Sequence, residues 1–338
     1  MIEGQVSKKR VLTLGADPEM FIFSGNKLIP AYEFLPAKGD GHMMYWDGFK
    51  AEWKYNHEGA HCQNNLVLYT RENLKKLEKL AKAKDPQARL SLTNVVRIPK
   101  DTLEAAHPLH VELGCQPSWN AYKMKGEAVI NPRKLAYRFA GGHMHFGTWT
   151  PNRPNYEKIV KTLDSVLGVW SVGVAQHMDN PIRRKYYGLA GEYRKPKYKG
   201  EGIGNIGGYG VEYRVLSNFW LASPSILQLT WDIGRMCVRL AGSRYGKLWA
   251  GNEAETIDVI NNCDHDRARK ILARNAPMFT WILKQVYQQP ESIKKAFDVC
   301  NQGLESVVPN PDDFKKNWHF GEEWIENGGQ PWARWESL

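Results

Sequence analysis

Alternating apolar and polar positions recur through the earlier part of the chain, and this period of two predicts β-strands. Small polar residues and glycines separate several of these stretches, as is typical of turns; examples are Ser24-Gly25-Asn26 and Asp47-Gly48. The segments expected as strands are 11–23, 27–34, 49–56, 93–98, 108–115, 136–149 and 210–217.

A helical period replaces this alternation in other stretches. In 70–84, Leu74, Leu77 and Leu80 fall on one helical face, and Thr70 is expected to cap the start of that helix. Ser before Pro is a typical helix start. The further helices are expected over 155–178, from Ser223 to about Leu240, and in broken segments over 254–302.

The order of the expected elements indicates the fold class. Strands come first and helices dominate afterwards, which favours an α+β fold over a doubly wound α/β fold. No clean domain boundary precedes about residue 245. We therefore expect a core over 1–245 and a helical C-terminal extension over 246–338, whose Trp-rich tail packs back on the core.

The composition of the chain indicates its cellular compartment. The 338 residues are 42% apolar, enough for a full core, and the first residues contain no apolar stretch of the secretory type. No apolar run approaches the ~18 residues of a membrane span. The five cysteines include no Cys-x-x-Cys pair, so neither a disulfide framework nor a zinc knuckle is supported. We expect a cytoplasmic protein with no membrane partner.

The net charge of +10 allows three interpretations: a solvated basic surface, a basic funnel for an anionic substrate such as ATP, or a nucleic-acid partner. The lysines and arginines are spread along the chain, and no nucleic-acid-binding motif accompanies them. A nucleic-acid partner is therefore possible but not favoured.

Three expected strands each carry two ionisable residues two positions apart, and such residues share one face of a strand. Among apolar neighbours these pairs would form a concave site of carboxylates, imidazoles and a guanidinium, which suits divalent metals and phosphate. The pairs are Asp17 with Glu19, His143 with His145, and Glu212 with Arg214.

The acidic pair Asp17 and Glu19 flanks Pro18, and such residues are depleted in strands. A divalent cation would explain two acids in an apolar strand; a bulge on an edge strand is the alternative. Asp47 and Glu52 form a second acidic pair, which alone would be an ordinary surface hairpin.

The two histidines follow Gly141-Gly142, and glycines let the backbone approach a ligand closely. No third His or Cys stands at zinc-site spacing, so we expect one histidine on a magnesium-type ion and the other on a nucleotide or substrate. A P-loop and a Gly-x-Ser-x-Gly elbow are both absent from the sequence. The loop 195–210 has the length and glycine content of a lid.

A basic cluster with interspersed glycines also stands between the histidines and the last pair. Arginines bind phosphate and carboxylate groups bidentately, although a solvated loop would have the same appearance. These arginines are Arg183, Arg184 and Arg194.

The motifs occur in a specific order: Asp-Pro-Glu, Asp-Gly with a later Glu, Gly-Cys, Gly-Gly-His-x-His, Arg-Arg with Tyr-Gly-x-Ala-Gly, and Glu-Tyr-Arg with Phe-Trp-Leu. In that order they resemble the phage-type carboxylate–amine ligases (COOH–NH2 ligase type 2) of the glutamine synthetase and glutamate–cysteine ligase-like superfamily. The resemblance covers about residues 11–222. If the chain is phage-encoded, the expected compartment is the host cytoplasm. Gln116 to Asn120 depart from it, because an expected acid after Gly114-Cys115 is lacking, and this leaves substrate recognition open.

The resemblance implies a curved antiparallel sheet with helices on its outer face, and ATP with roughly two or three Mg²⁺ or Mn²⁺ ions on the concave face. A carboxylate would attack the γ-phosphate to give an acyl phosphate, and an amine would then displace phosphate to form an amide. The carboxylate donor and the amine acceptor would each be a small molecule, a peptide or a protein.

By position, the resemblance also assigns roles to the residues. The expected metal ligands are Asp17, Glu19, Asp47, Glu52, His143 and Glu212. Arg214 would stabilise charge on the transferred phosphoryl group, and Glu52 and Arg138 would act with it in catalysis. The expected nucleotide or substrate contacts are His145, Arg183, Arg184 and Arg194. The rival hypothesis is a non-catalytic phage binding or structural protein with a basic surface.

Overall fold

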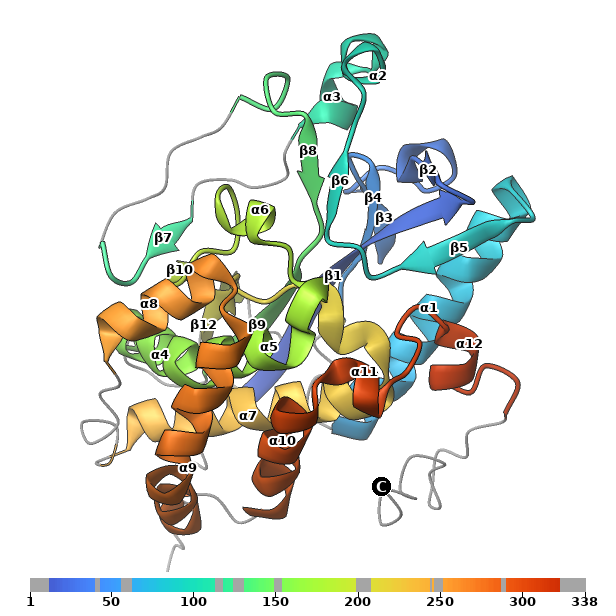
Figure 1. Ribbon diagram of the computed structural model, residues 1–338. Helices are drawn as coiled ribbons and strands as arrows, with labels where there is room; N and C mark the ends of the chain where they lie inside the picture. The colour runs from blue at the N-terminus through green and yellow to red at the C-terminus, as the bar shows by residue number, and fades with distance from the viewer. Residues whose placement is uncertain are drawn as a thin grey trace, which may run out of the picture.

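An antiparallel sheet of ten strands forms the centre of the molecule, in the strand order β3-β4-β1-β9-β12-β10-β7, with β2 and β5 also paired to β1 and β11 to β12. Helices accompany the sheet, which confirms the expected mixed α+β class (Figure 1). The computed structural model describes residues 12–39, 43–55, 63–112, 118–123, 131–148, 154–198, 208–243, 245, 252–286 and 290–322.

The elements have the following bounds. The strands are β1 (Leu12–Ser24), β2 (Lys27–Ile29), β3 (Met44–Asp47), β4 (Lys50–Trp53), β5 (Ala88–Ser91), β6 (Val95–Arg97), β7 (Trp119–Asn120), β8 (Tyr137–Phe139), β9 (Gly142–Thr148), β10 (Glu192–Arg194), β11 (Lys197–Tyr198) and β12 (Gly208–Tyr213). The α-helices are α1 (Gln63–Lys84), α2 (Lys100–Ala105), α3 (Pro108–Val111), α4 (Tyr156–Leu163), α5 (Val169–Ala175), α6 (Pro181–Arg184), α7 (Pro224–Gly242), α8 (Glu253–Asn262), α9 (His265–Val286), α10 (Pro290–Gln302), α11 (Leu304–Val307) and α12 (Phe314–Asn317). Short 3₁₀ segments are η1 (Ala31–Glu33), η4 (Gln176–Met178) and η5 (Asn218–Ala222), and η3 (Asp164–Gly168) is a π-helical turn.

Strand β1 lies inside the sheet and changes neighbours at Pro18. Its first half pairs with β9 up to Pro18 opposite Gly142, and its second half pairs with β5, β4 and β2. Because proline has no N–H to donate, it is tolerated best where one ladder ends and another begins. The alternative of a bulge on an edge strand is therefore wrong, and Asp17 and Glu19 project from a central strand.

One face of the sheet is apolar and carries the helices. The core side chains of the three central strands are Ala16, Met20, Met144, Phe146, Val211 and Tyr213. Helix α7 packs closely on β9 at Gly234. A Cβ added to this glycine would lie only 2.6 Å from Phe146 Cζ. In Figure 1 helices α4, α5 and α7 lie together beside β1, β9 and β12, while β6, β8, α2 and α3 extend from the far end. The ionisable pairs therefore project from the opposite face of the sheet.

The strand expected over 108–115 is wrong where it is described. Pro108–Val111 is the short helix α3, with proline in its first turn and His107 Nδ1 accepting a hydrogen bond from Leu109 N at 3.3 Å. Proline fixes the helical φ of the first turn, so local chemistry overrode the alternating pattern. Residues 113–115 of that expected strand lie outside the described residues.

Thr70 is not the cap of a helix start, which corrects a second expectation. Helix α1 already begins at Gln63, and the Thr70 hydroxyl donates to the Leu66 carbonyl at 2.7 Å within the helix. The expected strand 27–34 also ends early, at Ile29, because Pro30 leads into a 3₁₀ turn. Five short strands lie outside the expected segments, namely β3, β5, β7, β10 and β11.

The later helices pack on the core, with α9 and α10 against α5. The buried Trp318 indole N–H donates to the Leu221 carbonyl at 2.7 Å, and Arg71 of α1 donates to the carbonyls of Trp318, His319 and Glu322. The division of the chain at residue 245 stays a prediction. Among the described helices, none has the length and apolar character needed to span a bilayer.

Candidate active site

The register of the central strands aligns the expected pairs on one face of the sheet. Asp17 of β1 lies opposite His143 of β9, and His145 lies opposite Glu212 of β12. Glu19 lies opposite Glu52 of β4. Residues directly opposite each other in an antiparallel pair project to the same side. The face that carries no core helices thus presents a continuous row of ionisable groups, which we call the polar face.

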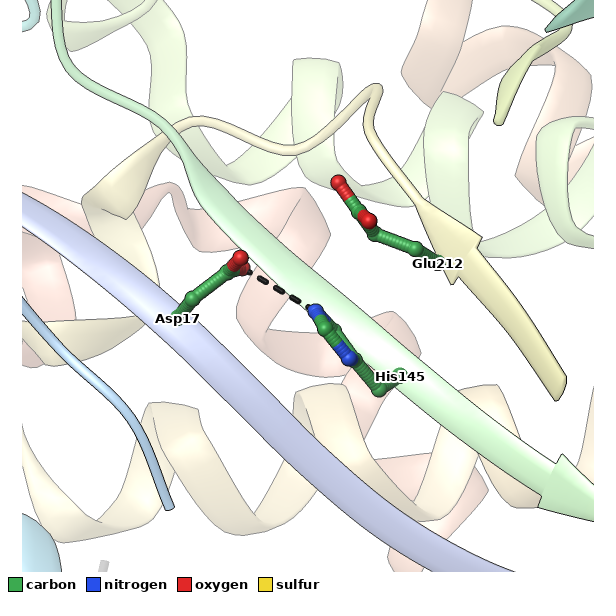
Figure 2. Close-up of side chains that lie close together, drawn as sticks. All are labelled: Asp17, His145 and Glu212. Atoms are coloured by element: carbon green, nitrogen blue, oxygen red, sulfur yellow. Dashed lines mark ion pairs between the residues drawn. The ribbon is translucent and has the colours of Figure 1, made fainter. Parts of the chain in front are cut away.

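Two groups of possible metal ligands occur on this face within the described part of the chain. The first consists of Asp17, His145 and Glu212, whose ligand atoms lie within 4.8 Å of one another. Figure 2 shows these side chains converging from three neighbouring strands. The Asp17 Oδ1 atom lies 3.2 Å from His145 Nε2 and 3.1 Å from His143 Nδ1. Two carboxylates and an imidazole can all coordinate a divalent cation.

Charges in this first group compensate one another. Burial alone would raise the pKa of Asp17, but His145 and His143 outweigh it and hold that pKa well below its ordinary value. Burial would likewise lower the pKa of His145, and the Asp17 carboxylate raises it instead. Burial and Asp17 act to raise the pKa of Glu212, yet His145, Arg214 and His143 lower it overall. The two carboxylates are therefore ionised near neutral pH.

Glu212 also receives two guanidinium groups. Arg214 Nη1 and Arg194 Nη1 both approach Glu212 Oε1, the latter at 3.3 Å. Arg214 is nearly fully buried, whereas Arg194 keeps 27% of its side chain exposed. Arg194 comes from β10 and lies opposite Glu212, so the row of charges continues toward that edge of the sheet.

The second group consists of Glu19, Asp47 and Glu52, again with ligand atoms within 4.8 Å of one another. A lysine on the same face lies between two of these acids: Lys50 Nζ is 3.0 Å from Glu19 Oε1 and 3.0 Å from Asp47 Oδ2. Glu52 accepts hydrogen bonds from the Tyr45 hydroxyl and, at 3.4 Å, from Lys38. Burial, followed by the charges of Asp47, Asp17 and Glu19, raises the pKa of Glu52 to about 8.

His143 has contacts at both ring nitrogens. Nδ1 faces Asp17, and Nε2 hydrogen-bonds the hydroxyl of the buried Tyr187. The Arg214 guanidinium also lies over the Tyr187 ring as a cation–π pair, with its Cζ 5.2 Å from the ring centroid. His145 is therefore better placed than His143 to ligate an ion, and His143 is placed to hold Asp17.

The two glycines before the histidines make room for protein side chains. A Cβ on Gly141 would lie 2.8 Å from His143 Nε2 and 3.1 Å from the Tyr187 hydroxyl, and a Cβ on Gly142 would clash with Trp220. The Gly141 N–H donates to Glu19 Oε2 at 2.6 Å. The sequence predicted that these glycines let a ligand approach the backbone. In the structure they let the side chains of Tyr187 and Trp220 approach it instead.

Three expected site arginines point elsewhere. Arg138 donates to the Leu135 carbonyl at 2.7 Å and to the Val111 carbonyl at 3.0 Å, and burial lowers its pKa to about 10. Arg183 and Arg184 are 0% and 1% exposed. They donate to backbone carbonyls beyond β12, among them that of Val215, and Arg184 also pairs with Asp179. These guanidiniums hold the backbone together and do not join the row of charges.

Sequence reasoning missed Lys50, Tyr45 and Tyr187. Lys50 was discoverable, because it precedes Glu52 by two positions on the same strand and must share its face. Tyr45 would have followed from its position opposite Glu52, once β3 was known. Tyr187 carries no local signal, since its contact with His143 joins residues 44 positions apart. The expected loop over 195–210 is wrong at both described ends, because Lys197 and Tyr198 pair with Tyr209 and Gly208 as strands β11 and β12. Residues 199–207 of the expected lid lie outside the described residues.

Comparison with known proteins gives one match. Residues 133–320 match the family model described as Phage phiEco32-like COOH.NH2 ligase-type 2. Neither a curated protein nor a solved structure matches the chain. The match includes the histidine pair, Glu212 and Arg214, whereas Asp17, Glu19, Asp47 and Glu52 precede it.

Proposed function

The chain belongs to the Phage phiEco32-like COOH.NH2 ligase-type 2 family, and from this premise we propose that it joins a carboxylate to an amine in an ATP-dependent reaction. The family name supports a ligase that acts on carboxyl and amino groups. The proposal of ATP dependence rests on the convergence of Asp17, His145 and Glu212 beside Arg214 on the polar face. Such a site combines ligands for a divalent cation with a fixed positive charge, as phosphoryl transfer requires.

The donor set fits Mg²⁺ or Mn²⁺, with Asp17, His145 and Glu212 as the residues that would hold the ion. A bound ion would neutralise phosphate charge and polarise the phosphoryl group. Asp17 and Glu212 keep lowered pKa values, so both carboxylates are ready to bind a cation at neutral pH. His143 and Tyr187 fix the position of Asp17 from behind.

The arginines would bind the transferred phosphoryl group and stabilise its negative charge. Arg214 is held by Glu212 and by the Tyr187 ring, so its guanidinium cannot reorient freely, and a preorganised charge stabilises a developing negative charge efficiently. Arg194 is more exposed and nearer the sheet edge, which suits contact with a phosphate or a substrate carboxylate.

The proposed reaction has two steps. An oxygen of the substrate carboxylate attacks the γ-phosphorus of ATP, the bond to the β,γ-bridging oxygen breaks, and an acyl phosphate and ADP result. The amine nitrogen then attacks the acyl carbon, the bond to the phosphate oxygen breaks, and the nitrogen loses a proton as the amide forms. The polar face would position both substrates and hold charge, which accounts for most of the catalysis of phosphoryl transfer.

Hydroxylamine provides a test that needs little knowledge of the amine. Acyl phosphates react with hydroxylamine to give hydroxamates, so the enzyme with ATP, Mn²⁺ and a panel of carboxylic acids should form a coloured ferric hydroxamate together with ADP. Asp17→Asn should abolish both products, while Asp101→Asn, an exposed acid on α2, should not. ADP or hydroxamate formation that survives in Asp17→Asn would contradict the proposed site.

Ligand-induced stabilisation provides a second test without any acceptor. ATP with Mn²⁺ at about 100 times the dissociation constant should stabilise the wild type by roughly 2.7 kcal/mol. The shift should be absent in Asp17→Asn and present in Asp101→Asn. Thermal unfolding measures it directly, and a shift of equal size in both variants would place nucleotide binding elsewhere.

The rival function, binding through a basic surface, has one supporting feature. A surface cavity of about 680 Å³ along α1 is lined by several lysines, including Lys75, Lys79 and Lys82. Glu72 and Glu78 line the same cavity and pair with its lysines, which reduces its net charge. Retention on heparin that falls steeply with salt would favour this rival.

A further inference from the structure

Lys50 occupies the centre of the second acidic group. Its ammonium lies 3.0 Å from Glu19 Oε1 on β1 and 3.0 Å from Asp47 Oδ2 on β3, so it bridges the two strands on either side of its own. Only 9% of the Lys50 side chain is exposed. Lysine is almost never buried to this extent without charged partners.

The position of this ammonium is the position that a shared cation would take. Glu19, Asp47 and Glu52 offer oxygen atoms within 4.8 Å of one another, which is suitable for one cation of small radius. Lys50 Nζ already lies between two of these oxygens. The third acid, Glu52, is engaged by the Tyr45 hydroxyl and by Lys38.

The first acidic group is built differently. His143 Nδ1 lies 3.1 Å from Asp17 Oδ1 and 3.8 Å from Glu212 Oε1, so the group nearest to both of its carboxylates is an imidazole and not an ammonium. An imidazole that loses its proton becomes a metal ligand, whereas an ammonium has no lone pair to offer. The two groups therefore differ in what a divalent ion would meet on arrival.

We propose that the Lys50 ammonium takes the place of a divalent cation between Glu19 and Asp47, so that the polar face binds one such ion before nucleotide is added, at Asp17, His145 and Glu212. This inference rests on the proposed function, and it differs from the roughly two or three ions that the family resemblance implies. A second divalent ion among Glu19, Asp47 and Glu52 would approach a buried positive charge at a few ångströms. Like charges at that separation repel strongly in a low-dielectric site.

The proposal has a consequence for the charge that the site holds. A lysine supplies a single positive charge that is always in place and does not depend on the concentration of metal ions. It also links β3, β4 and β1 on the polar face. Glu19 is then a strand-bridging residue, and Asp47 is its counterpart on β3.

Counting bound Mn²⁺ tests the proposal. Free Mn²⁺ gives an electron paramagnetic resonance signal that disappears on binding, so a titration without nucleotide yields the number of ions per chain. We expect one ion for the wild type and two for Lys50→Met, which keeps the aliphatic length but removes the charge. The additional ion should be lost again in the double variant Asp47→Asn/Lys50→Met.

Lys38→Met is the matched control. Lys38 also approaches Glu52, at 3.4 Å, but its side chain is 52% exposed and does not lie between two acids. We expect Lys38→Met to bind one ion, as the wild type does. A gain of one ion in both lysine variants would show a general charge effect and would overturn a specific role for Lys50.

The outcomes separate this proposal from the proposed function. An equal count for wild type and Lys50→Met overturns the role of Lys50, whatever that count is. A wild type that binds no Mn²⁺ contradicts the metal site at Asp17, while a gain of one ion in Lys50→Met would still support the Lys50 role. If Lys50→Met does not fold, Asp47→Asn decides: an unchanged count of one supports the proposal, and a fall from two to one overturns it.

Discussion

The two faces of the central strands are built by opposite rules from alternating residues of the same segments. On β1, β9 and β12, the face that carries the helices presents Ala16, Phe146 and Tyr213, and the polar face presents Asp17, His145 and Glu212. The apolar face buries side chains from water, which is the main source of folding free energy. The polar face buries ionisable groups, which costs free energy unless each charge is compensated.

This difference indicates how stability and chemistry are divided. A cluster of buried charges is supported by the packing behind it, so its groups keep fixed positions although they contribute little stability themselves. Changes on the polar face should therefore affect activity and leave the fold intact. Changes on the apolar face should affect the fold first.

The largest expected effect is on turnover, from Glu212→Gln on the polar face. The amide keeps the size of the side chain but removes a charge that pairs with Arg214 and, as proposed, holds a cation. We expect hydroxamate formation to fall roughly 10³-fold, in the range observed when preorganised charge is lost. The variant should still fold, but its free energy of unfolding in urea should fall by about 3 kcal/mol, because the buried Arg214 charge loses its carboxylate partner.

Glu104→Gln on α2 is the control, since its side chain is 67% exposed and belongs to neither acidic group. It should retain full turnover. A Glu212→Gln protein that does not fold, or one that folds and keeps full turnover, would break the comparison, because the polar face would then be structural and not catalytic.

The next effect is on stability, from Phe146→Ala on the apolar face. Phe146 is 1% exposed and packs against Gly234 of α7, so its removal leaves a cavity between sheet and helix. We expect a loss of about 3–5 kcal/mol in the free energy of unfolding, measured in urea. Leu109→Ala, with 52% exposure, should cost less than about 0.5 kcal/mol. Comparable losses from both would contradict the assigned core.

A smaller effect concerns an ionisable contact on the apolar face, between Asp164 and Tyr213. Asp164 is fully buried and accepts a hydrogen bond from the Tyr213 hydroxyl at 2.6 Å. Burial raises the pKa of Asp164 from 3.8 to about 7, partly offset by Tyr213 and Tyr122. A folded-state pKa above the unfolded value gives stability that is fully present below about pH 4 and is lost as the pH rises through about 7.

Asp164→Asn should remove this pH dependence. Between pH 5 and pH 8 the wild type should lose roughly 3 kcal/mol that the variant keeps, as measured by urea unfolding at several pH values. Parallel pH profiles of the two proteins would show that Asp164 is ionised in the folded state at all these pH values. The apolar face would then tolerate a charge, and the contrast between the faces would weaken.

The smallest effect is expected from Tyr187→Phe, which deletes only the hydroxyl that contacts His143. The ring and its contacts with the guanidiniums of Arg183 and Arg214 remain. A lost hydrogen bond of about 1 kcal/mol corresponds to a fall of roughly fivefold to tenfold in turnover. If Tyr187 holds His143, the loss should appear with Mn²⁺ binding weakened by a similar factor; an unchanged Mn²⁺ affinity would remove Tyr187 from the support of the site.

The sequence predicted the composition of the polar face better than its contacts. Spacing of two along a strand is enough to place Asp17 with Glu19 and His143 with His145 on common faces, because that rule depends only on local backbone geometry. The register between strands is not local, so the alignment of His145 with Glu212 required the structure.

The arginines show the limit of charge as a signal. Arg183 and Arg194 look alike in sequence, yet one donates to backbone carbonyls and the other reaches Glu212. The direction of a long side chain depends on which partners the fold brings near it. Several of these partners are backbone carbonyls, which every residue has, so the residue types do not reveal them. The family match begins at residue 133 and so gives no information on the earlier acids.

The contacts of Arg71 set an order for the synthesis of the protein. Helix α1 emerges early from the ribosome, but the Trp318 carbonyl that Arg71 Nε binds at 3.0 Å is encoded 247 positions later. At translation rates of about 5–20 residues per second, that interval is on the order of ten to fifty seconds. During that time the partly made chain exposes the surface of α1 that residues 318–322 later cover, so this contact cannot form before those residues have been synthesised.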